Sequence, residues 1–235
     1  MELSVAYYFK ETSAFVFPEL LQGLKHPVEM LGKAKPFLES FLAGKQENHG
    51  IVKGEVPALY GNYYIGEGTE IYDNVTIIGP VYIGKNVSIM PGAVIRPGTI
   101  ISDGCSVGQG SEIKASLLFS GAKVASLAFV GDSVLGKSAR IGSGVITANR
   151  KFDQSTASIT IQGVKTDLGR DFCGAVIGDS TRLGANSVTQ PGTHIGPHTW
   201  IFPLTNVRGF IPAQKRVFVE QNLTMTDNEQ RQLKD

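Results

Sequence analysis

Residues 65–119 decide the fold, and in groups of six they read IGEGTE, IYDNVT, IIGPVY, IGKNVS, IMPGAV, IRPGTI, ISDGCS, VGQGSE, IKASLL and F. Each group opens with a large aliphatic residue or Phe, from Ile65 to Phe119 without a gap. If about a quarter of residues were of these types, such a run would arise by chance at roughly 10⁻⁶. The chain therefore has an internal period of six.

The other positions of each group suit short strands joined by tight turns. The fourth position is mostly Gly or Asn, as in Gly68 and Asn74, and both residues tolerate positive φ. The fifth position is small or β-branched, as in Thr69 and Cys105, which suits a tightly packed wall. A turn every six residues with one inward aliphatic side chain per side predicts an all-β fold, a three-sided parallel β-helix. The period leaves the handedness open, although crossover connections are usually right-handed.

Two interruptions break the repeat. The register slips between Leu118 and Phe129 and stops again over residues 148–176. Between and after these breaks the inward positions are predicted to be Phe129, Leu135, Ile141 and Thr147, and then Ile177, Leu183, Thr189, Ile195, Ile201 and Val207. Loops that leave a solenoid often lie on its binding face, so function should be sought at these breaks.

We expect three parts: an N-terminal arm and short helices over 1–60, the β-helix over 61–211 with an inserted loop at 148–176, and a C-terminal strand and polar tail over 212–235. Residues 1–20 resemble an arm or strand. Two short helices should follow over 26–44, broken at Pro36, and pack on the first coil. We expect a closing strand over residues 217–219 and a frayed polar tail over residues 226–235.

Composition narrows the function classes. With 42% hydrophobic and 18% charged residues the chain is globular, and its net charge of +1 argues against nucleic acid or an anionic membrane as partner. The N-terminus lacks a secretory leader, and no apolar run is long enough to span a bilayer, so we expect a cytoplasmic protein. Cys105 and Cys173 have no metal-ligand spacing, which favours reduced, buried thiols over a disulfide.

The segment from Arg96 to about Val207 resembles the C-terminal acetyltransferase domain of bifunctional N-acetylglucosamine-1-phosphate uridylyltransferases, and more closely that of archaeal-type sugar-phosphate nucleotidylyltransferases. The resembling text is Arg96-Pro97-Gly98, Glu112-Ile113-Lys114, Phe129-Val130-Gly131-Asp132, Ile141 through Asn149, Gly169-Arg170 and Gly174 through Asp179. This covers roughly half the chain, and the run Gly144-Val145-Ile146-Thr147-Ala148-Asn149 is its most specific part. The resemblance implies a left-handed β-helix and, by analogy of fold, a homotrimer with sites between neighbouring prisms.

The resemblance also implies roles for single residues. Arg96 and Lys114 would hold the phosphate of a sugar phosphate, and two cations on successive coils can converge on one phosphate. A solvated corner Arg and a wall Lys are the alternative. Asn149, with Ser143 and Ala185, would contact acetyl-CoA or another acyl-CoA as co-substrate. Asn149 could equally be an ordinary turn residue.

The chain departs from the family at the catalytic base. The family pattern K-x-G-H-x-x-Y reads here Lys123-Val124-Ala125-Ser126-Leu127-Ala128-Phe129, so Ser126 stands in place of the His and Phe129 in place of the Tyr. A sugar amine attacking a thioester needs a group that accepts its proton near neutral pH, which an unassisted Ser does not do. Arg140 replaces a substrate-contacting Asn and would add a cation beside Arg96 and Lys114.

The remaining histidines offer few substitutes. His194 and His198 lie in late coils and are most simply surface residues, although His194 of a neighbouring subunit could supply a base. The three-His zinc site of a γ-class carbonic anhydrase does not occur here, and no metal is expected. Residues 1–60 also lack the G-x-G-T-R loop of a nucleotidylyltransferase, so we do not expect this chain to make nucleotide sugars by itself.

Two functions remain open at this point. The first is an acyl-CoA-dependent acyltransferase, most simply an acetyltransferase, that acts on a sugar phosphate or related small acceptor without the usual His. The second is a non-catalytic protein that binds a sugar phosphate or nucleotide sugar, or that docks a separate nucleotidylyltransferase. In the first, Ser126 would orient the acceptor, and a base would come from elsewhere, such as His194 of a neighbouring subunit.

Overall fold

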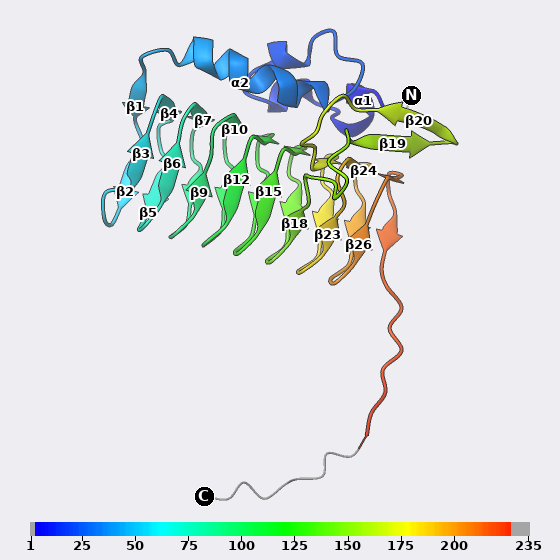
Figure 1. Cartoon of the computed structure of the whole chain (residues 1–235). Coiled ribbons are helices and arrows are strands. Elements are labelled where there is room, and N and C mark those ends of the chain that lie inside the picture. The colour runs from blue at the N-terminus through cyan, green and yellow to red at the C-terminus, as the bar shows by residue number, and fades with distance from the viewer. Residues whose placement is uncertain (1–2, 227–235) are drawn as a thin grey trace, which may run out of the picture.

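The computed structural model describes residues 3–226, and three parallel sheets wind around one core in it (Figure 1). Each coil contributes a strand to sheet A, then one to sheet B and one to sheet C. Sheet A consists of β1 (Gln46–Asn48), β4 (Tyr63–Ile65), β7 (Val81–Ile83), β10 (Thr99–Ile101), β13 (Leu117–Leu118), β16 (Val134–Leu135), β21 (Ala175–Ile177), β24 (Thr193–Ile195) and β27 (Phe210–Ile211).

The other two sides of the prism are built in the same way. Sheet B consists of β2 (Ile51–Lys53), β5 (Glu70–Tyr72), β8 (Ser88–Ile89), β11 (Ser106–Val107), β14 (Lys123–Val124), β17 (Arg140–Ile141), β22 (Arg182–Leu183), β25 (Trp200–Ile201) and β28 (Arg216–Val217). Sheet C consists of β3 (Ala58–Tyr60), β6 (Thr76–Ile78), β9 (Val94–Ile95), β12 (Glu112–Lys114), β15 (Phe129–Gly131), β18 (Ile146–Thr147), β23 (Val188–Thr189) and β26 (Asn206–Val207). The predicted fold class is confirmed: the chain is a left-handed parallel β-helix.

The aliphatic residues of the six-residue period fill the core. Ile65 and each following first-position residue through Ile113 are completely buried inside the prism. At the slip between Leu118 and Phe129 the prediction was wrong by one residue on each side, because Leu118 points inward instead of Phe119, and Val130 instead of Phe129. The turns between strands contain the predicted positive-φ residues, for example Gly68. Residues with a bulky side chain adopt a positive φ only at an energetic cost.

The N-terminal segment forms helical turns over 5–21, where an arm or strand was predicted, and one helix over 29–41, where two were predicted. It contains α1 (Val5–Tyr8), the 3₁₀ turns η1 (Thr12–Ala14) and η2 (Pro18–Leu21), and α2 (Glu29–Phe41). Pro36 lies inside α2 and does not split it into two helices. The buried face of α2, with Met30, Leu31, Ala34 and Leu38, packs into an aromatic cluster, and this packing outweighs the hydrogen bond that Pro36 cannot donate.

This segment covers the outer face of sheet A along several coils, not only the first (Figure 1). The outward side chains of the sheet stand in one in-register row: Tyr64, Tyr82, Ile100, Leu117, Val134, Val176, His194 and Phe210. Phe9 and Phe15 stack on Phe119 at ring-centroid distances of 4.5 Å and 4.8 Å. One side of the prism is therefore buried by the chain's own N-terminus.

The predicted boundaries differ from those observed. The β-helix starts at Gln46, before residue 61, since β1, β2 and β3 already pair with the next coil. The insertion 148–176 contains the antiparallel hairpin β19 (Ser158–Ile161) and β20 (Val164–Asp167), which packs beside the N-terminal segment. The closing strand β28 ends at Val217, and residues 227–235 of the predicted tail lie outside the described residues.

Candidate functional site

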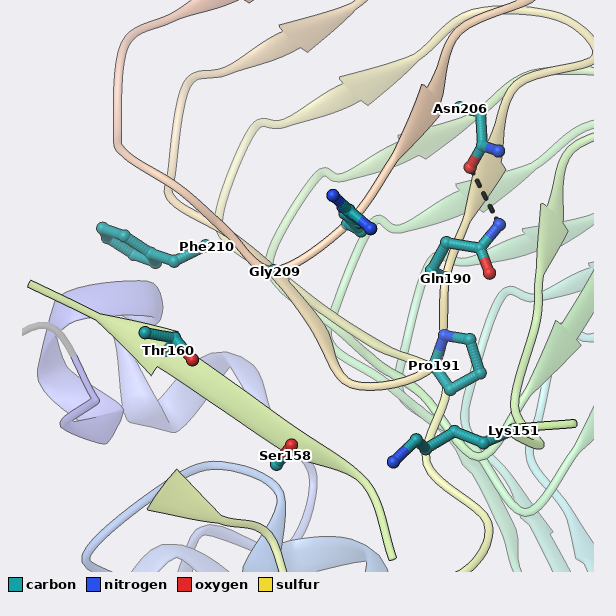
Figure 2. Close-up of a pocket in the computed structure, with 9 residues that line it drawn as sticks. Lys151, Ser158, Thr160, Gln190, Pro191, Asn206, Gly209 and Phe210 are labelled. Atoms are coloured by element: carbon teal, nitrogen blue, oxygen red, sulfur yellow. Dashed lines mark hydrogen bonds between the residues drawn. The ribbon is translucent and has the colours of Figure 1, made fainter. Parts of the chain in front are cut away.

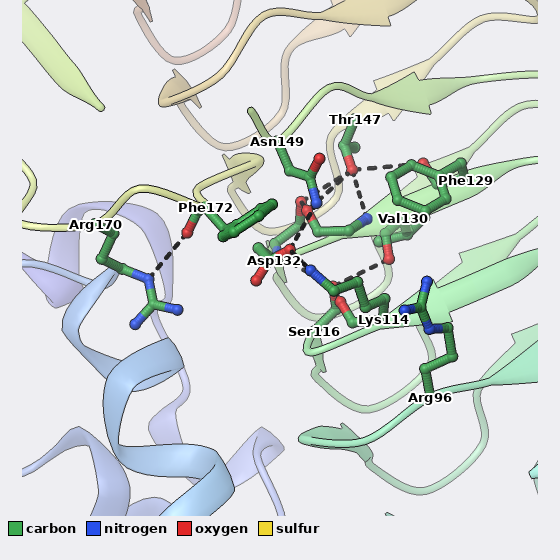
Figure 3. Close-up of polar contacts among 12 residues, drawn as sticks. Arg96, Lys114, Ser116, Phe129, Val130, Asp132, Thr147, Asn149, Arg170 and Phe172 are labelled. Carbon is green, nitrogen blue, oxygen red and sulfur yellow. Dashed lines mark hydrogen bonds and ion pairs between the residues drawn. The ribbon is translucent and has the colours of Figure 1, made fainter. Parts of the chain in front are cut away.

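Asp132 is the centre of a polar cluster at the C–A corner, the turn that joins each sheet C strand to the next sheet A strand (Figure 3). Its carboxylate accepts hydrogen bonds from Lys114 Nζ at 2.9 Å and from Asn149 Nδ2 at 2.7 Å. The parallel register brings these residues together, because Lys114 pairs with Gly131 and Phe129 with Ile146 on successive coils. The Asp132 side chain is 5% exposed and that of Lys114 is 23% exposed, so the ion pair is partly desolvated.

The insertion closes over this cluster. Lys114 Nζ lies 4.4 Å from the ring centroid of Phe172, and the Arg150 guanidinium lies 4.5 Å from the same ring. Arg170 donates a hydrogen bond to the Phe172 carbonyl (Figure 3). Sequence reasoning assigned no role to Asp132 or Phe172. The run that contains Asp132 was recognised, but only the register shows that its carboxylate meets Lys114 and Asn149.

Arg96 lies one coil before Lys114 on the same edge of sheet C, since Ile95 pairs with Ile113. Its guanidinium makes an ion pair with Glu112 at 2.6 Å, and the side chain remains 42% exposed. Phe129 also belongs to this group, because its ring and the Asn149 side chain both lie against Gly131. A Cβ added to Gly131 would be 2.6 Å from Phe129 Cε1 and 2.7 Å from Asn149 Nδ2. The structure thus brings Arg96, Lys114, Phe129 and Asn149 to one region (Figure 3).

Ser126, Ser143 and Ala185 form a second group at the B–C corner, where each sheet B strand turns into sheet C. Gly144 N donates to the Ser126 carbonyl, and Asn186 N donates to the Ser143 carbonyl. The three residues therefore stack in one column on successive coils. Within one chain this column lies across sheet C from the Lys114 cluster, so Ser126 and Asn149 occupy different corners.

Two further residues named from the sequence lie apart from the Lys114 cluster of their own chain. Arg140 is on β17 of sheet B, in register with Lys123 and Arg182, and does not face the Lys114 cluster of its own chain. His194 is not a surface residue, because it stands in the outward row of sheet A with 0% exposure. Its ring packs edge-on against Tyr8, and burial lowers its pKa to about 4.

The B–C corner therefore contains no histidine of the described chain. His26 precedes α2, His49 follows β1, and His198 lies in the turn between β24 and β25. Within residues 3–226 no group of three or more His, Cys, Asp or Glu side chains is placed to hold a metal ion. Over the same residues, no helix has the length and apolar character that a bilayer crossing requires.

A groove of about 900 Å³ lies between β19 and the last coils (Figure 2). It is lined by Lys151, Ser158, Thr160, Gln190, Pro191, Asn206, Arg208, Gly209 and Phe210. Hydroxyl, amide and cationic groups predominate, and no carboxylate from the described residues 3–226 lines it. One residue that lines the groove, Lys151, follows Asn149 by two positions in the sequence. The groove lies at the C–A corner, as the Asp132 cluster does.

Comparison with known proteins gives a consistent picture for this part of the chain. Residues 77–173 match the family model of the GMPPB C-terminal domain. The bifunctional protein GlmU of Methanococcus maripaludis is 34% identical over 204 residues, which cover 86% of this chain and 48% of that protein. A bifunctional sugar-1-phosphate nucleotidylyltransferase/acetyltransferase of Sulfurisphaera tokodaii is 36% identical over 157 residues, or 67% of this chain and 39% of that protein. The chain thus spans less than half the length of these relatives.

The similarity to solved structures is weak. A GDP-perosamine N-acetyl transferase from Caulobacter crescentus, in complex with CoA and GDP-perosamine, is 17% identical with a TM-score of 0.37, covering 63% of this chain and 51% of that one. An Arabidopsis UDP-N-acetylglucosamine acyltransferase is 14% identical with a TM-score of 0.38, covering 69% and 70%. At these values the likeness carries no argument about function. The repeat, the fold and the longer relatives together identify the chain as a hexapeptide-repeat left-handed β-helix protein, similar to the acetyltransferase domain of GlmU-type proteins.

Proposed function

We propose that this protein is of the acyltransferase type and binds a sugar phosphate or nucleotide sugar at the C–A corner of sheet C, with an acyl-CoA as co-substrate. The observation that carries the proposal is the Asp132 cluster with Arg96 beside it, which lies inside the segment that matches the family model. The name of one such relative includes sugar-1-phosphate nucleotidylyltransferase and acetyltransferase. The groove lined by Lys151 and Gln190 lies at the same C–A corner on the following coils, although none of the cluster residues lines it.

The charges support an anionic acceptor. Arg96 donates a hydrogen bond from Nη1 to Glu112, and the other N–H groups of its exposed guanidinium can donate to a phosphate. Lys114 is fixed by Asp132 and packed on Phe172, so its position is set before a ligand arrives. In this proposal Arg96 makes the direct phosphate contact, Lys114 lies one coil further along the same edge, and Asn149 and Phe129 border the bound sugar.

Acyl transfer to an amine also requires a proton acceptor. Ser126 stands at the B–C corner, and the neighbour's His194 suggested by the sequence is buried under Tyr8 with a lowered pKa. A homotrimer that packs sheet B of one prism beside sheet C of the next would bring Arg140 and the Ser126 column close to the Lys114 cluster. In this arrangement sheet A stays covered by the N-terminal segment.

The burial of His194 also favours the second candidate function, a protein that binds a sugar phosphate or nucleotide sugar without turnover. It would keep the cations and the groove while lacking a base. The two candidates share the binding site and differ in whether acyl-CoA is consumed.

The binding site is tested by calorimetry with an amino sugar 1-phosphate on the parent protein, on an Arg96→Ala, Lys114→Ala double variant, and on Lys53→Ala as matched control. Lys53 makes an ion pair with Glu70 on the early coils, far from the cluster. We expect the double variant to lose binding and the control to keep it. If the double variant binds every sugar phosphate as the parent does, the site is excluded.

Turnover is tested separately. Thermal shift with acetyl-CoA reports co-substrate binding, and a thiol-release assay with the same sugar phosphates reports transfer. Thiol release in the parent protein would establish the acyltransferase. Sugar-phosphate binding without any acetyl-CoA binding at millimolar concentration would leave the non-catalytic function.

A further inference from the structure

The fourth residue of α2 is a glycine, Gly32, and it lies against the insertion. Glycine inside a helix is less favourable than alanine, because it loses more conformational freedom on folding. The structure shows what the missing side chain makes room for. A Cβ added to Gly32 would lie 3.3 Å from Nη1 of Arg170, which follows β20 in the insertion. Figure 3 shows the Arg170 side chain extending toward this helix, drawn in blue. Gly32 therefore admits the guanidinium of a residue that is distant in sequence.

Arg170 also fixes the backbone next to Phe172. Its Nε donates a hydrogen bond to the Phe172 carbonyl at 3.1 Å, and its own carbonyl accepts one from Ala157 N at 2.8 Å. Cys173 N donates to the Asn149 carbonyl at 2.9 Å, so this short segment is held at both ends and the Arg170 side chain bonds the carbonyl between them. Among residues 3–226 no carboxylate makes an ion pair with Arg170. Its contribution is therefore a hydrogen bond to the backbone.

The Phe172 ring in turn positions two cations. Lys114 Nζ lies 4.4 Å and the Arg150 guanidinium 4.5 Å from the ring centroid. Cations are attracted to the face of an aromatic ring, because the ring quadrupole is negative there. Lys114 is also the residue that pairs with Asp132. A displacement of Phe172 would therefore release both cations from their places beside the Asp132 cluster.

Helix α2 also lies against the coil that carries Arg96. A Cβ added to Gly98, two residues after Arg96, would lie 3.5 Å from Lys35 Cβ on α2. The helix thus contacts both the turn that follows Arg96 and the insertion that covers Lys114. The buried face of α2 packs into the aromatic cluster on sheet A, so the helix is a fixed support for both.

We propose that Arg170 is a positioning residue that couples the docked N-terminal segment to the Asp132 cluster. The helix α2 holds Arg170, Arg170 holds Phe172, and the Phe172 ring keeps two cations in place for the phosphate of the ligand. The identity of that ligand rests on the proposed function. Coupling between two sites is reciprocal, so a bound sugar phosphate should also protect residues 3–44 from limited proteolysis.

The first experiment needs no ligand. Trp200 is the only tryptophan in the sequence, so a protein with Trp200→Phe and Phe172→Trp reports on position 172 by its fluorescence. In this protein Arg170→Met, and Gly32→Leu, whose side chain displaces the guanidinium, should make the indole more accessible to quenching by acrylamide. The matched control is Lys165→Met, the loss of an exposed cation on β20, which should leave quenching unchanged. Unchanged quenching in Arg170→Met overturns the proposal.

The second experiment is calorimetry with glucosamine 1-phosphate on proteins that keep Trp200. We expect Arg170→Met to weaken binding about fivefold, the scale of one lost hydrogen bond, and Lys165→Met to bind as the parent does. In a Phe172→Ala background Arg170→Met should cause no further loss, because Arg170 acts through Phe172. Additive losses of affinity would mean that Arg170 acts by another route, and they contradict the proposal.

The two experiments separate this inference from the proposed function. If the parent binds no glucosamine 1-phosphate while Arg170→Met still increases quenching, the proposed function fails and the coupling of Arg170 to Phe172 is supported. If the parent binds the sugar phosphate while Arg170→Met changes neither quenching nor affinity, the proposed function stands and this inference fails.

Discussion

The ring of His194 lies edge-on against the ring of Tyr8, with centroids 5.6 Å apart, and joins the β-helix to the N-terminal segment. His194 Nδ1 contacts the Gly192 carbonyl at 3.0 Å, and Nε2 has no hydrogen-bond partner among the described residues. A protonated imidazole would thus be buried with one N–H unsatisfied. The neutral form is favoured when the N-terminal segment is docked.

This contact predicts a loss of stability in mild acid. Burial lowers the His194 pKa from 6.5 to about 4, so between these values the unfolded chain binds a proton that the folded chain does not. Stability contributed by neutral His194 is present above pH 6.5 and is lost as the pH falls toward 4, by an amount on the order of 3 kcal/mol. Urea unfolding from pH 7 to 4 measures it. His194→Phe should flatten this part of the curve, and an unchanged slope in that variant would assign the effect to other groups.

Phe119 should anchor the N-terminal segment. It is fully buried between Phe9 and Phe15, outside the prism core. Phe119→Ala should cost about 3–5 kcal/mol and make residues 3–44 sensitive to limited proteolysis before the β-helix unfolds. The matched control is Phe218→Ala, since Phe218 is 59% exposed and should change stability by less than about 0.5 kcal/mol. Equal effects in the two variants would argue against the docked segment.

The Lys114–Asp132 pair should be coupled in stability as well as in geometry. Lys114→Met leaves a carboxylate that is 5% exposed with Asn149 as its remaining side-chain donor, which should cost about 1–3 kcal/mol. Adding Asp132→Asn removes the uncompensated charge, so the double variant should be more stable than Lys114→Met alone. Urea unfolding of the parent, both single variants and the double variant measures the coupling. Additive effects would mean that the ion pair contributes nothing.

Both thiols should be unreactive in the folded protein. Cys105 and Cys173 are free and buried, and burial raises the pKa of each to about 12. The thiolate is the reactive form, so a disulfide reagent at pH 8 should label neither residue until denaturant is added. Labelling of Cys173 alone under native conditions would show that the insertion opens.

Ser126→His tests whether the B–C corner can still support acyl transfer. If the proposed acyltransferase ancestry is right, this variant should increase thiol release from acetyl-CoA in the presence of a sugar phosphate. Gln109→His is the matched control, because Gln109 lies one coil earlier in the same column and its carbonyl accepts from Leu127 N. Acetyl-CoA binding without any gain in Ser126→His would favour the non-catalytic function.

The site was only partly predictable. Family resemblance led to Arg96, Lys114 and Asn149, and these do lie together with Phe129. It could not identify Asp132 as the residue that joins Lys114 to Asn149, because that contact depends on which residues occupy neighbouring coils. The same is true of Arg140, which lies on sheet B whereas Lys114 lies on sheet C.

By itself the sequence determined the prism, because a six-residue period of buried aliphatic residues with positive-φ corners has one efficient way to bury its side chains. It also determined where the repeat breaks. Only the tertiary structure decided what covers the outside. Contacts between distant segments decide three features. Leu118 instead of Phe119 points into the core, the helical N-terminal segment covers sheet A, and His194 is buried. Such packing overrides local propensity and leaves no periodic trace in the sequence.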